Sequence, residues 1–485
     1  MNSMMDPFES ATSLAAKLRS GDITAREAVD AAIARIEAID PLINAVVVRN
    51  FEAAREAANE ADRARENGEI MGRLHGVPMT IKEAFDLAGL STTWGVPNLR
   101  NNVAPRDSLI AEKLKAAGAI ILGKTNVPPM LSDWQTFNDI YGTTNNPWDV
   151  TRSPGGSSGG AAAALAAGMT PLEVGSDIGA SIRSPSHFCG VYGHKASFGV
   201  VPTDGHTVPG LEVELDLLVA GPMARTSADL RLGLELLAGP SREESAAWRL
   251  DLPVEAHDKL SDFRVAVCLD ESVCRVDEQV KAAVHRVADY CVSQGAAVSH
   301  TARPEFDFAQ AQDRYLTILR GATGALMNDE EFASAREVAA KLAPDDRSYW
   351  AYLNRAAVQG HRHFFTAEQD RRRIRDAWAA FFQEWDIFLC PIAASTAIQH
   401  DQDRPRHERT ITVNGRQESY NDQLFWAGMA TLPYLPSTVF PAGPSDNGLP
   451  VGVQAIGPYL QDLRTIRFAE LLEDGLCGFS APPGY

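Results

Sequence analysis

Two runs of very small residues constrain this chain of 485 residues more than any other feature. The first run, GGSSGG, covers residues 155–160, and the second, GSDIGAS, covers residues 175–181. Glycine permits backbone conformations and close approaches that larger residues forbid, and the alanine-rich residues 161–168 between the runs favour a helix. Because apolar residues flank both runs, they are not typical of a flexible linker. The pattern predicts a tight site where backbone N–H groups point at a bound molecule.

Charge and composition exclude several classes of partner. The formal net charge of −18 argues against a nucleic-acid partner or an anionic membrane surface, since both need clustered Lys and Arg. No run of 18 apolar residues and no signal-peptide pattern occurs, so we expect no membrane span. Cys, His and carboxylates show no metal-ligand spacing, and we expect no metal and no cofactor. Six scattered cysteines indicate reduced thiols in a cytoplasmic protein, namely Cys189, Cys268, Cys274, Cys291, Cys390 and Cys477.

Apolar periodicity predicts strands that alternate with helices. A strand at residues 77–82 would end in Lys82, and residues 239–253 form a polar surface excursion. Helices are expected at residues 10–19, 24–39, 51–67, 108–118, 227–237 and 277–294, and they dominate residues 308–385; further strands are expected at 119–122, 263–269, 296–298 and 387–390. This alternation predicts an α/β fold.

Two short motifs match other enzyme classes. Residues 118–125 fit the phosphate-loop expression, but their central residues are apolar and strand-forming, and prolines follow at residues 128–129. We therefore reject a nucleotide site. Residues 155–159 fit the G-x-S-x-G turn of α/β-hydrolases, although the residues before the serine form a poor strand. A serine esterase of that type, with His194 or His206 as its base, remains an alternative.

A longer series of motifs resembles the amidase signature family. The GGSSGG run is followed by D-x-G-x-S-x-R-x-P, and the two family serines fall on Ser157 and Ser181, 24 positions apart. G-V-P-x-x-x-K ends at Lys82, and further family motifs fall at residues 123–128, 141–148 and 221–225. Residues 448–454 and 462–472 are similar to the closing strand and helix of the family. The D-x-G-x-S-x-R-x-P residues are Asp177, Gly179, Ser181, Arg183 and Pro185.

The resemblance implies one large domain with a mixed central β-sheet sandwiched between helices. In this scheme residues 1–68 form N-terminal helices and residues 70–235 form the signature core. Residues 236–385 form a variable, helix-rich part. Residues 386–485 return to the core with strands and a helix.

The resemblance also implies a mechanism of amide hydrolysis. Ser181 would be the nucleophile that carries the acyl group, Ser157 would relay its proton through an unusual cis peptide linkage, and Lys82 would be the terminal base. A lysine has an ordinary pKa of about 10.4, so Lys82 must be buried against its apolar strand to become a neutral base. The resemblance places the oxyanion hole at the N–H groups of Ile178, Gly179, Ala180 and Ser181.

Supporting roles are expected for three neighbours of these residues. Ser158 would hydrogen-bond within the relay, Asp177 would bind nearby amides and Arg183 would pin the loop. His187 and His194 have no part in this scheme, and we expect both to be structural. Many relatives have glycine where this chain has Ala180, whose methyl group would narrow the turn.

An apolar pocket suited to a small aryl or alkyl amide is expected beside the serines. Esters and carbamates (urethanes) would react through similar tetrahedral intermediates, so both are further expected substrates. A small molecule is the only partner expected, and homodimers are a common outcome for such enzymes. The pocket residues would be Met130, Leu131, Trp134, Tyr420, Phe425 and Trp426.

Two alternatives within the same fold stay open. One is the glutaminase subunit of a tRNA-dependent amidotransferase, whose relatives usually follow the lysine with Asp-Asn where this chain has Glu83 and Ala84. The other is a non-catalytic binding protein, which the intact Lys82, Ser157 and Ser181 disfavour.

Overall fold

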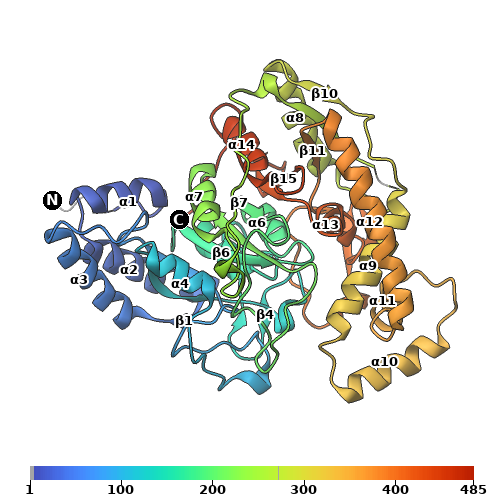
Figure 1. Ribbon diagram of the computed structural model, residues 1–485, viewed down its shortest axis with the longest axis horizontal. Coiled ribbons are helices and arrows are strands. Elements are labelled where there is room, and N and C mark those ends of the chain that lie inside the picture. Colours follow the sequence, from blue (N-terminus) through green and yellow to red (C-terminus); the bar gives the residue numbers. More distant parts are fainter. Residues whose placement is uncertain (1–4, 271) are drawn as a thin grey trace.

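Three N-terminal helices form one end of the molecule (Figure 1). The computed structural model describes residues 5–270 and 272–485. The helices are α1 (Ala11–Ser20), α2 (Ala25–Ile43) and α3 (Phe51–Glu66). A capping box between Thr24 and Glu27 begins α2 where the sequence predicted, but the helix continues through a proline to Ile43.

A three-stranded sheet connects this helical end to the main sheet. Its order is β1 (Val46–Arg49), β3 (Ile120–Thr125) and β2 (Pro78–Lys82), and α4 (Leu109–Ala116) precedes β3. Every residue of β2 and β3 is buried. Because β2 also packs alongside β6 (Leu172–Asp177), its last residue reaches the centre of the fold.

The main sheet has eight strands in the described part of the chain, in the order β10-β9-β11-β15-β14-β7-β8-β6. The first three strands are mutually parallel, and every later neighbour is antiparallel. The sheet is therefore mixed, as predicted. Its remaining strands are β7 (Tyr192–Lys195), β8 (Val219–Ala224), β9 (Arg264–Val267), β10 (Ala297–Ser299), β11 (Ile387–Cys390), β14 (Ser437–Pro444) and β15 (Pro450–Ile456).

Helices pack on both faces of this sheet. From one face Arg183 of α6 (Arg183–Cys189) donates to the Gln454 side chain of β15. On the other, Thr438 of β14 bonds Thr465 of α14 (Asp462–Glu473). Thr438 pairs with Ala455, and successive strand residues point to opposite faces, so the two helices lie on opposite sides. The other helices that pack on or beside the sheet are α5 (Gly159–Ala166), α7 (Ser227–Leu237), α8 (Glu278–Ser293) and α13 (Leu424–Thr431).

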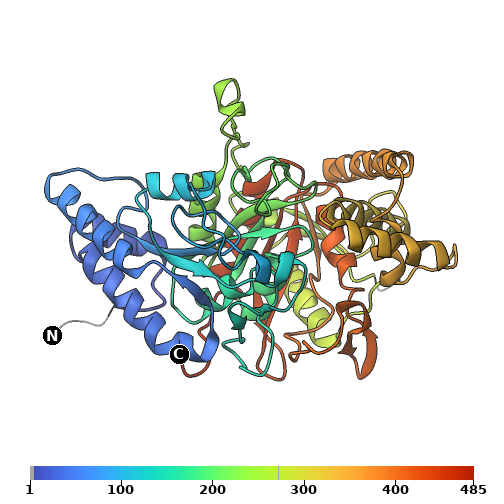
Figure 2. The same ribbon diagram turned by 90° about the horizontal axis from the view of Figure 1, so that it is seen from below.

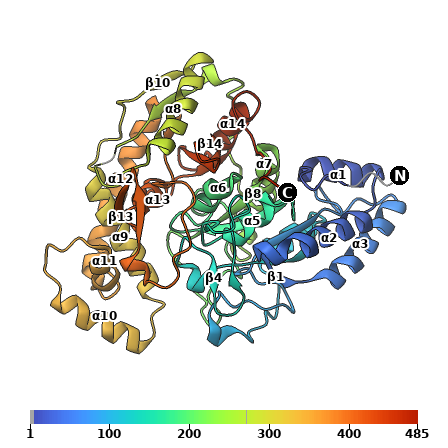
Figure 3. The ribbon, with the colours of Figure 1, turned by 180° about the vertical axis from the view of Figure 1, so that it is seen from behind.

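A second group of helices forms the end of the molecule opposite α1–α3 (Figures 1 and 2). These are α9 (Phe308–Gly324), α10 (Asp329–Lys341), α11 (Tyr349–Arg355) and α12 (His361–Glu384). The hairpin of β12 (Thr410–Val413) and β13 (Arg416–Ser419) lies on the same side, as Figure 3 shows from behind. Among the described residues, no helix is both long and apolar enough to cross a membrane.

One predicted surface segment is observed, and one observed strand was not predicted. The short helix η3 (Glu244–Ala246) projects from the body in Figure 2, within the predicted polar excursion. Strand β14 was not predicted, because Pro441 and Pro444 argue against a central strand. The strand tolerates them because β7 pairs only with Ser437–Val439, so both prolines lie beyond the part of β14 that has a neighbour on each side.

Candidate active site

Lys82 is a buried lysine surrounded by serine oxygens. Its Nζ lies 2.6 Å from Ser157 Oγ, 3.0 Å from Ser158 Oγ and 3.0 Å from Ser176 Oγ. The side chain is fully buried at the end of β2. Burial lowers the pKa of Lys82 to about 7, although the charges of Asp177 and Glu173 oppose this shift. A large neutral fraction therefore exists near neutral pH, and a neutral amine can accept a proton from a serine hydroxyl.

The loop before α5 brings Ser157 to this lysine. The peptide bond between Gly156 and Ser157 is cis. A side chain at Gly156 would collide with the backbone of residues 133 and 134, and one at Gly160 would collide with Asn126. These close approaches explain why the run contains glycine. Ser157 is 1% exposed, so bulk water does not surround its hydroxyl.

Ser181 lies in the turn between β6 and α6, and an ion pair shapes that turn. Asp177 accepts hydrogen bonds from the N–H groups of Ala180 at 2.9 Å and Ile182 at 3.0 Å, and its carboxylate pairs with Arg183 at 3.0 Å. Burial alone would raise the pKa of Asp177, but the Arg183 guanidinium outweighs it and holds the pKa below its usual value. The Ser181 carbonyl also accepts a bond from the Ser158 N–H at 3.0 Å, which ties the two serine loops together.

Two aromatic side chains hold the carbonyl groups of the same turn. Tyr315 donates to the Ile178 carbonyl at 2.9 Å, and the indole Nε1 of Trp134 donates to the Gly179 carbonyl at 2.6 Å. Because C=O and N–H point in opposite directions across a trans peptide, these bonds orient the N–H groups that follow each carbonyl. The two bonds thus fix the N–H groups of Gly179 and Ala180 and hold the turn in one orientation.

One predicted oxyanion donor needs correction. The Ala180 N–H already donates to Asp177, so it is not free to bind an oxyanion. The N–H groups of Ile178, Gly179 and Ser181 donate no hydrogen bond to any described residue. Ala180 itself adopts a left-handed conformation with φ of 72°, which explains why glycine suits this position.

A pocket of about 370 Å³ opens at Ser181. The predicted residues Met130, Leu131 and Trp134 line it, together with residues that the sequence did not single out. These include leucines of the segment before β8 and one face of α9. Ile178 and Gly179 of the predicted oxyanion turn also line the pocket, as do Ser132 and Asp133 directly after Leu131. The additional residues are Trp94, Leu215, Leu218, Leu319, Arg320, Thr323, Leu326, Met327, Glu331, Leu353, Arg406 and Leu424.

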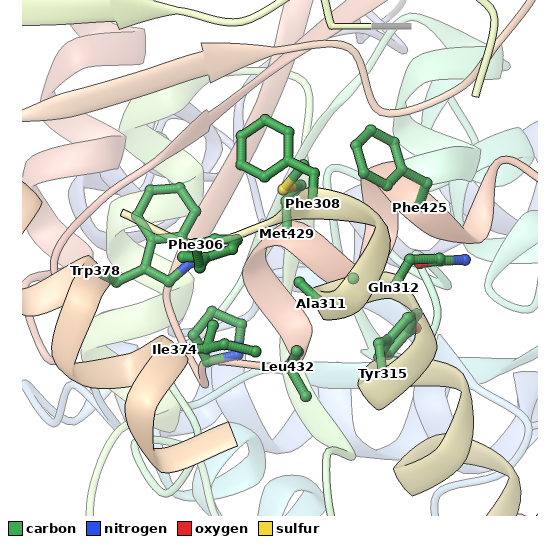
Figure 4. A pocket seen from close by; sticks show the side chains of 12 residues that line it. Phe306, Phe308, Ala311, Gln312, Tyr315, Ile374, Trp378, Phe425, Met429 and Leu432 are labelled. Atoms are coloured by element: carbon green, nitrogen blue, oxygen red, sulfur yellow. The ribbon is translucent and has the colours of Figure 1, made fainter. Parts of the chain in front are cut away.

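Three predicted pocket aromatics do not line this pocket. Tyr420 lies behind its wall, where its hydroxyl donates to Asp133 at 2.7 Å and its ring packs against Trp134. Phe425 lines a separate pocket of about 10 Å³, beside Phe308 and Met429 (Figure 4), which is too small for a substrate. Trp426 is fully buried in the core. Helix α13 is apolar on every side, so its sequence gives no sign of which side faces a cavity.

The histidines of the serine-esterase alternative contact neither serine. His194 bonds Thr438 and Asp462. His187, which was expected to be structural, accepts the Gly452 N–H at Nδ1 and donates from Nε2 to the Ser395 carbonyl. His206 bonds the Ala84 carbonyl, and burial lowers the pKa of its ring to about 3. All three rings are buried packing groups in this structure.

Lys124 of the rejected phosphate-loop motif is also a structural residue. It lies in strand β3, and its Nζ bonds the Ser91 carbonyl and Thr92 Oγ1. The six cysteines are free thiols, five of them buried.

Several site residues were missed by sequence reasoning. Ser176 contacts Lys82 and lies inside the second small-residue run, so the run itself was a signal for it. Glu173 is a fully buried carboxylate whose pKa is raised to about 7 by burial, with Lys82 opposing the shift. Tyr315 and Arg320 carried no signal, because nothing in the helix pattern of α9 shows what the helix packs against.

The chain is similar to known proteins over most of its length. The family model described as Amidase matches residues 27–466. An indoleacetamide hydrolase of Bradyrhizobium diazoefficiens is 34% identical over 468 residues, covering 94% of this chain and 84% of the relative. One subunit of the glutamyl-tRNA(Gln) amidotransferase of Deinococcus radiodurans is 32% identical, covering 97% and 98%. The crystal structure of a bacterial aryl acylamidase superposes with a TM-score of 0.80 at 26% identity, covering 96% of both chains.

Proposed function

This chain belongs to the amidase family, and from that premise we propose that it hydrolyses small aryl and alkyl amides through an acyl-enzyme on Ser181. It is a hydrolase of carbon–nitrogen bonds in amides other than peptides. One observation carries the finer proposal. Lys82 is buried, has a pKa near 7 and contacts Ser157. The loop that carries Ser157 is hydrogen-bonded to Ser181, and Ser181 lines the pocket.

The proposed first step is attack of Ser181 Oγ on the substrate carbonyl carbon. The Ser181 proton passes to Ser157 Oγ, and the Ser157 proton passes to neutral Lys82 Nζ. A relay is needed because a serine hydroxyl is a weak nucleophile at its ordinary pKa. The oxyanion would be held by the unoccupied N–H groups of Ile178, Gly179 and Ser181.

The relay then runs in reverse. Lys82 returns its proton through Ser157 to the leaving nitrogen as the carbon–nitrogen bond breaks, which leaves the acyl group on Ser181. Water attacks the ester carbonyl, and the same groups move its proton to Lys82 and back to Ser181. Aryl esters and carbamates would react by the same sequence, and we propose both as secondary substrates.

The pocket supports a substrate with an apolar body. Its wall carries leucines, Met130 and the indole of Trp134 next to Ser181. A volume of about 370 Å³ lies within the usual range for small-molecule sites.

A substrate panel tests the proposal. The panel contains an aryl acylamide, a primary amide, glutamine, an aryl ester and an aryl carbamate, each incubated with wild type, Ser181→Ala and Lys82→Ala. We expect amide hydrolysis by wild type and a loss of roughly 10³-fold or more in both variants. Ser293→Ala and Lys341→Ala change exposed residues of the same types and serve as matched controls.

The panel also separates the alternatives. Hydrolysis of glutamine alone, with a second chain that co-purifies, would favour the amidotransferase alternative. Full activity of Lys82→Ala together with loss in His194→Ala would favour the serine-esterase mechanism. No hydrolysis of any compound would overturn the proposed function.

A further inference from the structure

Two arginines line the same pocket as Ser181. Arg320 comes from α9, and Arg406 comes from the short helix η5 (Arg406–Glu408). Most other lining residues are apolar or aromatic, so the two guanidinium groups are its main cations. No ion pair between described residues includes either arginine.

Arg320 is the less satisfied of the two arginines. The residue is 6% exposed, and its Nε is buried without any hydrogen-bond partner among the described residues. Its Nη2 donates to the hydroxyl of Tyr349, whose ring centroid lies 4.9 Å from the guanidinium carbon. Burial lowers the pKa of Arg320, as expected for a cation without a counter-ion. A buried charge of this kind is costly unless it is paired.

Arg406 is fixed in position and adds positive charge. Its Nε donates to Asn421 Oδ1 at 2.9 Å, and its Nη1 donates to the Ser132 carbonyl. Its guanidinium carbon lies 5.5 Å from the same Tyr349 ring centroid and 5.7 Å from that of Trp134. Both guanidinium groups therefore lie close to the ring of Tyr349.

The carboxylates of the pocket do not neutralise Arg320. Asp133 accepts from Tyr420 and forms its ion pair with Arg409. Glu331 is exposed at the rim and caps α10 by accepting from the Asn328 N–H at 3.0 Å. The inner wall thus retains positive charge.

The helix that carries Arg320 also contacts the turn that holds Ser181. Tyr315 of α9 bonds the Ile178 carbonyl of the turn that holds Ser181. Arg320 follows five positions later, which corresponds to about 7.5 Å along a helix axis. Arg320 thus reaches the pocket of Ser181 from a later turn of α9 than Tyr315.

We propose that the substrate is an amide that carries a carboxylate several bonds from its scissile carbonyl, and that Arg320 binds this carboxylate. Arg406 contributes positive potential, and the leucines and Trp134 contact the apolar body between the two ends. This inference rests on the proposed function and names its substrate class.

Binding to a protein that cannot turn over its substrate tests the inference without relying on activity. Ser181→Ala is titrated with the 4-nitroanilide of glutaric acid and with the matched 4-nitroanilide of pentanoic acid, by calorimetry. We expect the carboxylated compound to bind about 10- to 100-fold more tightly, since charge-assisted hydrogen bonds are the strong ones. A third compound, 4-(pentanoylamino)benzoate, places the carboxylate on the amine side and identifies which side faces Arg320.

Variants test whether a preference for the carboxylated anilide depends on Arg320. Adding Arg320→Met should reduce the preference to within about threefold, because it weakens binding of the carboxylated anilide far more than binding of the neutral one. Thr323→Glu keeps Arg320 but places a carboxylate one helical turn away from it. This carboxylate should neutralise Arg320 and abolish the preference for the carboxylated anilide. Arg372→Met removes an exposed arginine of α12 and should change nothing.

The outcomes separate this inference from the proposed function. Equal binding of charged and neutral anilides, or a preference that survives both Arg320→Met and Thr323→Glu, would overturn the inference. Hydrolysis of the neutral anilide by wild type would then still support the proposed function. If wild type hydrolysed none of the anilides, the proposed function would fail and the substrate assignment would fail with it.

Discussion

Lys82 Nζ lies 2.6 Å from Ser157 Oγ, at the end of a strand in which every residue is buried. Three serine hydroxyls surround this nitrogen, and burial lowers the pKa of the lysine to about 7. A pKa near the working pH suits a general base, because the correct protonation state is then well populated. The strand and the serine loops thus place a base where a histidine lies in many other serine hydrolases.

The first prediction concerns pH. Because neutral Lys82 is the reactive form, kcat/KM for an aryl amide should fall about tenfold per pH unit below pH 7 and be level above it. Initial rates between pH 5 and pH 9 measure this, with fluorescence to show that the protein stays folded. A rate that stays constant down to pH 5 would contradict a lysine base.

The second prediction concerns the ion pair behind the nucleophile. Asp177→Asn keeps the side-chain volume but leaves the buried Arg183 guanidinium without its counter-charge. The free energy of unfolding should fall by about 3–5 kcal/mol, as measured by denaturant unfolding. Asp376→Asn breaks an exposed pair on α12 and should change it by less than about 0.5 kcal/mol. Equal effects of the two variants would argue against a structural role for Asp177.

The third prediction concerns the left-handed residue next to Ser181. Ala180→Gly removes the cost of a positive φ, about 1–2 kcal/mol, against a glycine entropy cost of about 0.5–1 kcal/mol. A net stabilisation of about 0.5–1 kcal/mol is expected, with kcat/KM within about threefold of wild type. Ala333→Gly on the exposed side of α10 should instead destabilise by about 1 kcal/mol. Thermal unfolding measures whether each variant is more or less stable than wild type. A destabilised Ala180→Gly protein would show that the turn is not strained.

The fourth prediction concerns Trp134. Trp134→Phe keeps an aromatic pocket wall but removes the hydrogen bond to the Gly179 carbonyl. A buried carbonyl left unbound costs about 1–3 kcal/mol, so the turn that holds Ser181 should lose its fixed position. We expect kcat to fall about tenfold, with a smaller change in KM. Trp248→Phe, at an exposed tryptophan, is the control. If only KM changed, Trp134 would be a pocket residue without a role in positioning the turn.

Sequence patterns predicted the parts of this site that are local in the chain. Lys82 ends an apolar strand, and Ser157 and Ser181 lie in runs of small residues, but their roles were predicted from the resemblance of these motifs to the amidase signature family. Tyr315 could not be found this way, because its partner Ile178 lies 137 positions away. The mixed sheet was expected, but β14 was hidden by its prolines.

The pocket was harder to predict than the reaction centre. Met130, Leu131 and Trp134 lie next to the serine loops and line the pocket. Phe425 and Trp426 were chosen for their residue type, yet they fill the core between α13 and its neighbours. Residue type alone does not tell which aromatic side chains face a cavity, since that depends on how distant helices pack.

The central claim is that Ser181 carries the acyl group, and mass spectrometry of the enzyme after reaction with an aryl carbamate tests it most directly. Carbamoyl esters of serine hydrolyse slowly, so the adduct should accumulate. We predict one added carbamoyl group that maps to the peptide containing Ser181, with no adduct in Ser181→Ala and slower labelling in Lys82→Ala. An adduct on Ser157 or on any other residue, or undiminished labelling of Ser181→Ala, would contradict the account.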